Sequence, residues 1–181
     1  MDSFDQNGIG WYKQEMQGSC LKGASGSGLS RIHSNPQFLI ELKDTDADSN
    51  DTCSCLISLL QFDGRRKRAD GLDFSEAFAS ICKYLGFQEN AFKNLSFPDF
   101  YLFDATNEEV PLSKGAIFSG MGKARKSQAL PLRANTMRFE VPPGKYIVIP
   151  ITYQFDDELK FLLRVFSEMP ANLKLVSSAT N

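Results

Sequence analysis

The sequence is poor in histidine, in net charge and in long hydrophobic runs. Its 181 residues include a single histidine, and 20 basic against 22 acidic side chains leave a formal charge of −2. A charge so close to zero argues against a global nucleic-acid footprint. No apolar run approaches the ~18 residues that a spanning helix needs, and the polar N-terminus lacks the pattern of a signal peptide. We therefore expect one soluble, intracellular globular domain.

The few cysteines and the single histidine also exclude classes of site. The cysteines are Cys20, Cys53, Cys55 and Cys82, and without a secretory context we expect free thiols. A zinc site would need further close ligand pairs, which the spacing does not provide. A nucleophilic enzyme needs Cys or Ser with His and an orienting Asn or Asp, and Cys20 with His33 is only a remote version of that set. We expect neither zinc nor a catalytic triad.

The hydrophobic pattern that is present has a period of two. Phe38, Ile40 and Leu42 share one face, as do the apolar residues of 159–165, which indicates half-buried antiparallel strands. Residues 53–62 and 146–151 are apolar on both faces, as expected for central strands. With regular turn signals between these runs, the pattern predicts an all-β sandwich.

Other stretches are less regular. Residues 74–85 fit both helical spacing and a strand, and their pattern alone does not decide between the two. Two glycine- and serine-rich passages, Gly18 to Ser34 and Ser113 to Gln128, are typical of surface loops.

The charges that nearly cancel in the total are strongly segregated. Between Glu41 and Asp51 five acidic residues and one lysine give a local charge of −4, whereas Arg65, Arg66, Lys67 and Arg68 give +4. The five acidic residues are Glu41, Asp44, Asp46, Asp48 and Asp51. Carboxylates about 7 Å apart repel by about 0.6 kcal/mol in water and about 2.4 kcal/mol at an effective dielectric of 20. A folded loop would therefore favour calcium or a neighbouring basic side chain, while a solvated surface loop screened by salt is the alternative.

Neither charged segment matches a known motif completely. Asp44, Asp46 and Asp48 imitate the start of an EF-hand, but Ser49 replaces the required glycine and Cys55 the final glutamate. The basic run, with Lys123, Arg125 and Lys126 further along the chain, would suit phospholipid headgroups better than nucleic acid, because it lacks interleaved aromatic residues. A second acidic loop tip, Asp156 to Glu158, is expected at one end of the sandwich, and the sequence does not decide which end.

In this order, several motifs resemble the sandwich domain of calpains. They are Asn35-Pro36-Gln37-Phe38, the acidic loop, the strand before Arg65 to Arg68, Asp99 to Leu102, Val141-Pro-Pro-Gly144-Lys-Tyr146, and Leu163-Arg-Val-Phe-Ser-Glu168. The resemblance covers about residues 8–170. The sequence departs from the family pattern at Cys20, where the family usually has tryptophan, and in Asp104 to Gln128, which is longer and richer in glycine.

The resemblance implies a C2-like antiparallel β-sandwich of about eight strands, with residues 1–7 as a tail and 171–181 as a linker. It implies a strand for residues 76–84. The parent would be a calcium-dependent cysteine protease, and this chain its non-catalytic regulatory domain. Calcium, or a salt bridge, would be held by Asp44, Asp46, Asp48 and Asp51, while Arg65, Arg66, Lys67 and Arg68 would contact lipid or a neighbouring domain.

The partners implied are the protease core and C-terminal domain of the same parent chain and anionic phospholipid, but not nucleic acid. The location implied is the cytoplasm, with calcium-dependent association with membranes. The alternative is a structural spacer whose charged loops make salt bridges between domains and bind neither calcium nor lipid.

Overall fold

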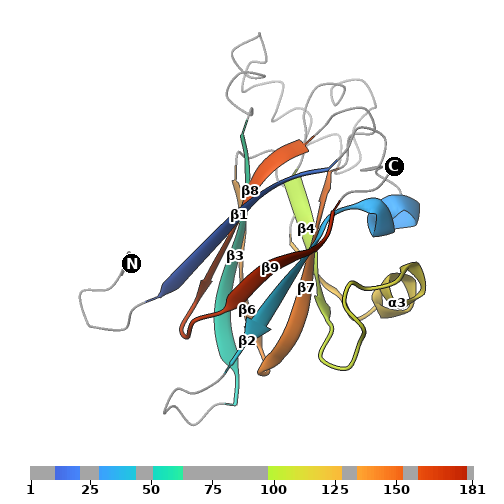
Figure 1. Ribbon diagram of the computed structural model, residues 1–181. Helices are drawn as coiled ribbons and strands as arrows, with labels where there is room; N and C mark the ends of the chain where they lie inside the picture. Colours follow the sequence, from blue (N-terminus) through green and yellow to red (C-terminus); the bar gives the residue numbers. More distant parts are fainter. Residues whose placement is uncertain are drawn as a thin grey trace, which may run out of the picture.

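The structure, a computed structural model, describes residues 11–20, 29–43, 51–62, 98–127, 134–152 and 159–178. They form two packed antiparallel sheets (Figure 1). The four-stranded sheet has the order β1 (Tyr12–Cys20), β8 (Leu159–Ser167), β3 (Cys53–Gln61), β6 (Ala134–Val141). The five-stranded sheet has the order β5 (Arg125–Lys126), β4 (Pro98–Asp104), β7 (Gly144–Thr152), β2 (Gln37–Leu42), β9 (Asn172–Ser177). The predicted all-β sandwich is confirmed, with nine strands in the described residues.

The period-two pattern builds the core between the sheets. In β3, Cys53, Cys55, Ile57 and Leu59 point inward and are at most 7% exposed. Phe161 of β8 meets a phenylalanine of β2 edge-on, with ring centroids 5.8 Å apart. Alternating side chains of a strand point to opposite faces, so each apolar series fills one side of its sheet.

The five-stranded sheet is also covered on its outer face. A 3-10 helix, η1 (Leu29–Ser34), and a short helix, α3 (Lys114–Gly120), contribute to a second apolar cluster against this face. Leu39 of β2 and Ile117 of α3 are buried there, at 7% and 0% exposure. The expectation that β2 is half-buried is therefore wrong, because a third layer covers its second face.

That third layer also corrects the expectation of a surface loop over residues 113–128. The hydroxyl oxygen of Ser113 caps α3 by accepting a bond from Ala116 N at 3.2 Å. Just before it, the buried side chain of Gln37 bonds both backbone groups of Leu112, accepting from N at 2.7 Å and donating to O at 2.9 Å. This amide clamp holds the segment before α3 against the sheet.

The C-terminal boundary differs from the one predicted. Residues 171–181 are assigned to a linker from the sequence, but β9 pairs with β2 along its length and extends the five-stranded sheet. Residues 74–85, where strand and helix compete, lie outside the described residues. Within the described ranges, no helix is long and apolar enough to cross a membrane.

Side chains join the two sheets at both lateral edges. At one edge, Asn135 of β6 donates to Pro98 O of β4 at 3.0 Å, and Arg125 of β5 donates to Glu140 O of β6 at 2.8 Å. At the opposite edge, the side-chain oxygen of Gln14 in β1 accepts from the backbone N of β9 at 2.7 Å. Each edge therefore carries at least one direct bond between the sheets.

Candidate functional site

The segregated charges attach to opposite ends of the central strand β3. At the first end, called the β2–β3 end, Leu42 is paired with Gly144 and Cys53 with Val141. At the second, the β3–β4 end, Gln61 is paired with Phe161 in one sheet and Pro98 with Thr152 in the other. The acidic connection leaves and rejoins the sandwich at the β2–β3 end, and the connection carrying the basic run begins and ends at the β3–β4 end.

The same register locates the second acidic tip. Its flanking strands, β7 and β8, stop and start at the β3–β4 end. The sequence does not decide which end of the sandwich carries Asp156–Glu158. The strands show that the connection containing these residues attaches at the β3–β4 end, as the connection with the basic run does.

At the β2–β3 end, two of the described carboxylates accept hydrogen bonds from neighbouring strand residues. Glu41 accepts from the side-chain amide of Asn172 at 3.2 Å, and Glu168 accepts from Ser54 N at 3.2 Å. Glu168 and Ser54 also line a cavity of about 10 Å³ beside Cys53, which is the space of about one water molecule. Both bonds lie beside the points where the acidic connection leaves β2 and rejoins β3.

Most of the predicted site residues cannot be placed. Asp44, Asp46 and Asp48 lie outside the described residues, as do Arg65, Arg66, Lys67 and Arg68. Asp51 is described and is exposed to solvent just before β3. Among the described residues, no group of three or more His, Cys, Asp or Glu side chains could hold a metal ion. The predicted calcium loop therefore remains a prediction.

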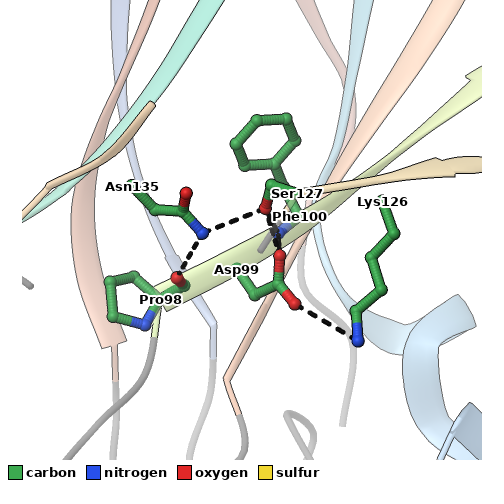
Figure 2. A network of polar contacts seen from close by, with 6 residues as sticks. All are labelled: Pro98, Asp99, Phe100, Lys126, Ser127 and Asn135. Carbon is green, nitrogen blue, oxygen red and sulfur yellow. Dashed lines mark hydrogen bonds and ion pairs between the residues drawn. The ribbon is translucent and has the colours of Figure 1, made fainter. Parts of the chain in front are cut away.

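A buried polar network lies at the β3–β4 end, where β4 begins (Figure 2). The Asp99 carboxylate is 0% exposed, accepts from Phe100 N at 2.8 Å and from the hydroxyl of Ser127, and pairs with Lys126 Nζ at 3.5 Å. Asn135 donates to the Ser127 oxygen at 3.0 Å and also reaches β4. Burying a carboxylate costs little free energy only when the charge is paired and hydrogen-bonded, and the Asp99 carboxylate is both.

Sequence reasoning missed the role of this network. Asp99 entered only as part of a family motif, and Lys126 only as a candidate for lipid contact. The available signal was an acidic residue directly before the apolar run Phe100–Phe103, because such a carboxylate is buried with its strand and needs a partner. The partners lie 27 to 36 residues further along the chain, so spacing did not reveal them.

The described thiols have the character of core residues. The Cys20 thiol donates to Pro150 O at 3.6 Å, and burial raises its pKa to about 12. Burial, with the adjacent Cys53 adding to it, also raises the pKa of Cys55 to about 12. The His33 ring faces Phe118 of α3, with centroids 6.4 Å apart. A thiolate is the nucleophilic form of cysteine, and burial opposes it at Cys20 and Cys55.

Comparisons with known proteins place the chain in a family. The family model described as calpain large subunit, domain III, matches residues 10–166. Calpain clp-1 of Caenorhabditis elegans is 30% identical over 158 residues, which is 87% of this chain and 17% of the relative. The calpain-2 catalytic subunit of Homo sapiens is 30% identical over 173 residues, covering 92% of this chain and 22% of the relative. Calpain-B of Drosophila melanogaster is 27% identical over 169 residues, covering 91% and 16%.

The chain thus spans roughly a fifth of the length of these curated relatives. The match runs from just before β1 to Phe166 in β8, so it includes every strand of both sheets except β9. The chain belongs to the calpain large subunit domain III family.

Proposed function

We propose that this domain is the non-catalytic regulatory module of a calpain-like cysteine protease in the cytoplasm. It couples calcium binding at the acidic connection, residues 41–51, to the protease core, and the basic run, residues 65–68, contacts anionic phospholipid or a neighbouring domain. The observation that carries the proposal is that the two connections attach to opposite ends of β3. A strand of nine residues separates its ends by about 27 Å, so the two charged segments can meet different partners at once.

Two further observations support this assignment. Phe62, at the end of β3, has 43% of its surface exposed and lies three residues before the basic run, and an exposed aromatic beside basic residues suits the surface of an anionic membrane. The raised thiol pKa values of Cys20 and Cys55 support a non-catalytic role.

Calorimetric titration of calcium tests the metal part of the proposal. We expect saturable heat with the wild-type chain and its loss in an Asp46→Asn/Asp48→Asn variant. The matched control is Glu108→Gln/Glu109→Gln, which removes the same charge from two exposed residues outside the acidic connection and should retain the heat. Equal and negligible heats for the wild type and the Asp46/Asp48 variant would refute calcium binding.

Vesicle sedimentation tests the lipid part. Neutralising Arg65, Arg66, Lys67 and Arg68 to glutamine should weaken calcium-dependent binding to phosphatidylserine vesicles.

The second candidate function, a spacer held by salt bridges between domains, predicts no dependence on calcium or anionic lipid. Exposed ion pairs contribute only ~0.2–1 kcal/mol each, so such a spacer needs several of them.

A further inference from the structure

The strand β1 forms a long, regular edge of the four-stranded sheet. Its pairing with β8 runs without a register shift from Tyr12 to Cys20, and β1 contains no proline. Natural proteins shield the edge of a sheet with short strands, proline or bulges. The other described edges are shorter or interrupted: β5 has two residues, β9 pairs with β2 through a register shift, and Arg125 bonds an edge carbonyl of β6. In Figure 1, β1 crosses in front of β3 at the near edge of the sandwich.

The hydrogen bonds of the sheet show which backbone groups of β1 face outward. Phe62 N bonds Lys160 O at 3.0 Å, so the even-numbered residues of β3 and β8 form the hydrogen-bonded pairs between these strands. Bonded and non-bonded pairs alternate in antiparallel strands, so the odd-numbered residues of β8 bond the even-numbered residues of β1. The backbone groups of Glu15, Gln17 and Ser19 therefore point away from the sheet, and no described residue bonds them. Such a row of groups is a template for one further strand.

The side chains beside this edge carry charges of opposite sign. Lys13 and Glu15 are exposed on the outer face of β1, while Gln14 and Met16 point inward. Glu15 bonds Arg164 of β8 at 3.1 Å and reaches Lys13 of its own strand only at 3.9 Å. Residues two apart on one strand are separated by about 7 Å, whereas directly opposite residues of paired strands have Cβ atoms about 4.5–5.5 Å apart. A strand with a carboxylate opposite Lys13 and a cation opposite Glu15 would therefore fit this edge.

A second copy of β1 supplies this arrangement. If two copies pair antiparallel about a twofold axis at Gln14, Lys13 of each copy lies opposite Glu15 of the other. An axis at Lys13 or at Glu15 would place identical charges opposite each other, which is unfavourable. On the inward side, the same register places Tyr12 of each copy opposite Met16 of the other, and a ring and a thioether make a favourable contact. Both faces of the strand therefore select the same register.

We propose that β1 is the contact surface for a second copy of this chain, and that the two copies form a twofold-symmetric dimer by antiparallel pairing of β1. The pairing joins the two four-stranded sheets into one and bonds the outward backbone groups of the edge. It uses none of the residues assigned to calcium or lipid binding. Its failure would leave the calcium titration untouched, and failure of that titration would leave the dimer untouched.

Sedimentation equilibrium of the chain, over concentrations from about 10 μM to about 1 mM, tests the proposal. We expect the average mass of the wild type to rise with concentration toward that of a dimer. Lys13→Glu and Glu15→Lys each place like charges opposite one another and should weaken self-association about tenfold. An equimolar mixture of the two variants restores both pairs of opposite charges and should associate as the wild type does.

The matched control for the charge reversals is Glu140→Lys. Glu140 is exposed on β6, the other edge strand of the same sheet, and pairs with Arg138 as Glu15 pairs with Arg164. This variant should associate as the wild type does. Thermal melts establish that each variant is folded.

Cysteine cross-linking tests the register. Gln14→Cys places two thiols opposite each other at the axis, where the Cα atoms of a non-bonded pair lie about 4.5 Å apart, within reach of a disulfide. Mild oxidation should link two copies of Gln14→Cys but not two copies of Met16→Cys, and the wild type controls for the native cysteines. The proposal is overturned by a wild type that stays monomeric over the whole concentration range or by single charge variants that associate as the wild type does. It is also overturned by a mixture that does not associate or by equal cross-linking at positions 14 and 16.

Discussion

Replacing Asp99 by alanine should lower the free energy of unfolding by about 3–5 kcal/mol, because it breaks a fully buried charged network. The carboxylate accepts bonds from Phe100 N and the Ser127 hydroxyl, and hydrogen bonds to a charged group contribute about 1.5–3 kcal/mol each. The ion pair to Lys126 adds at most about 1 kcal/mol, since that side chain is 37% exposed. Phe100 N also donates to the Ser127 hydroxyl oxygen at 3.1 Å, so it retains an acceptor in the variant. The expected loss of unfolding free energy is therefore smaller than the sum of the separate hydrogen bonds.

Two milder variants divide this loss into charge and hydrogen bonding. Asp99→Asn keeps an acceptor of the same shape and should cost about 1–2 kcal/mol. Lys126→Met removes the cation alone and should cost less than about 1 kcal/mol. The predicted order of destabilisation is therefore Asp99→Ala, then Asp99→Asn, then Lys126→Met.

Equilibrium unfolding in urea, followed by circular dichroism and tryptophan fluorescence, measures this order. Coincident transitions of the two probes establish two-state unfolding. If the unfolding free energy keeps the same slope against urea concentration, the effect is assigned to the native state. A loss below about 1 kcal/mol for Asp99→Ala would refute the reasoning, as would equal losses for Asp99→Ala and Asp99→Asn.

Three further predictions concern packing, the third layer and pH. Gly18→Ala places a Cβ 2.6 Å from a ring carbon of Phe161 and should cost about 1–3 kcal/mol in urea unfolding, whereas Gly122→Ala, in open space, should cost almost nothing. Gln37→Leu removes the amide clamp, leaves two buried backbone groups unpaired, and should cost about 2–4 kcal/mol with faster amide exchange before α3. The pKa of Cys20 is raised from 9.0 to about 12, so its stabilising contribution is complete below pH 9 and is lost as the pH rises toward 12. Cys20→Ala should flatten this alkaline loss of stability, and an unchanged pH profile would contradict it.

The sandwich itself was predictable because burial on one face imposes a period of two on the sequence. The runs that became β2 and β8 show that period directly. The third layer was not predictable in this way. Its apolar contacts come from single residues such as Ile117 set among glycine and serine, and composition of that kind favours a loop.

The candidate sites also differ in whether their residues are close together or far apart in the sequence. The charged runs at residues 41–51 and 65–68 are local in sequence, so their existence could be predicted, and the register of β3 then located their attachments. The Asp99 network joins residues far apart in the chain, and its pairing depends on which strands become neighbours. Gln37 likewise looks like an ordinary polar residue of a strand until its partner in the third layer is known.

The bonds that join the two sheets at both lateral edges have a mechanical consequence. Two stacked sheets can slide past one another when only apolar contacts join them, because such contacts have no fixed direction. Here Asn135 and Arg125 at one edge and Gln14 at the other fix the sheets in register. Sliding of one sheet over the other would break these bonds, so a force applied at the β2–β3 end should move both sheets together.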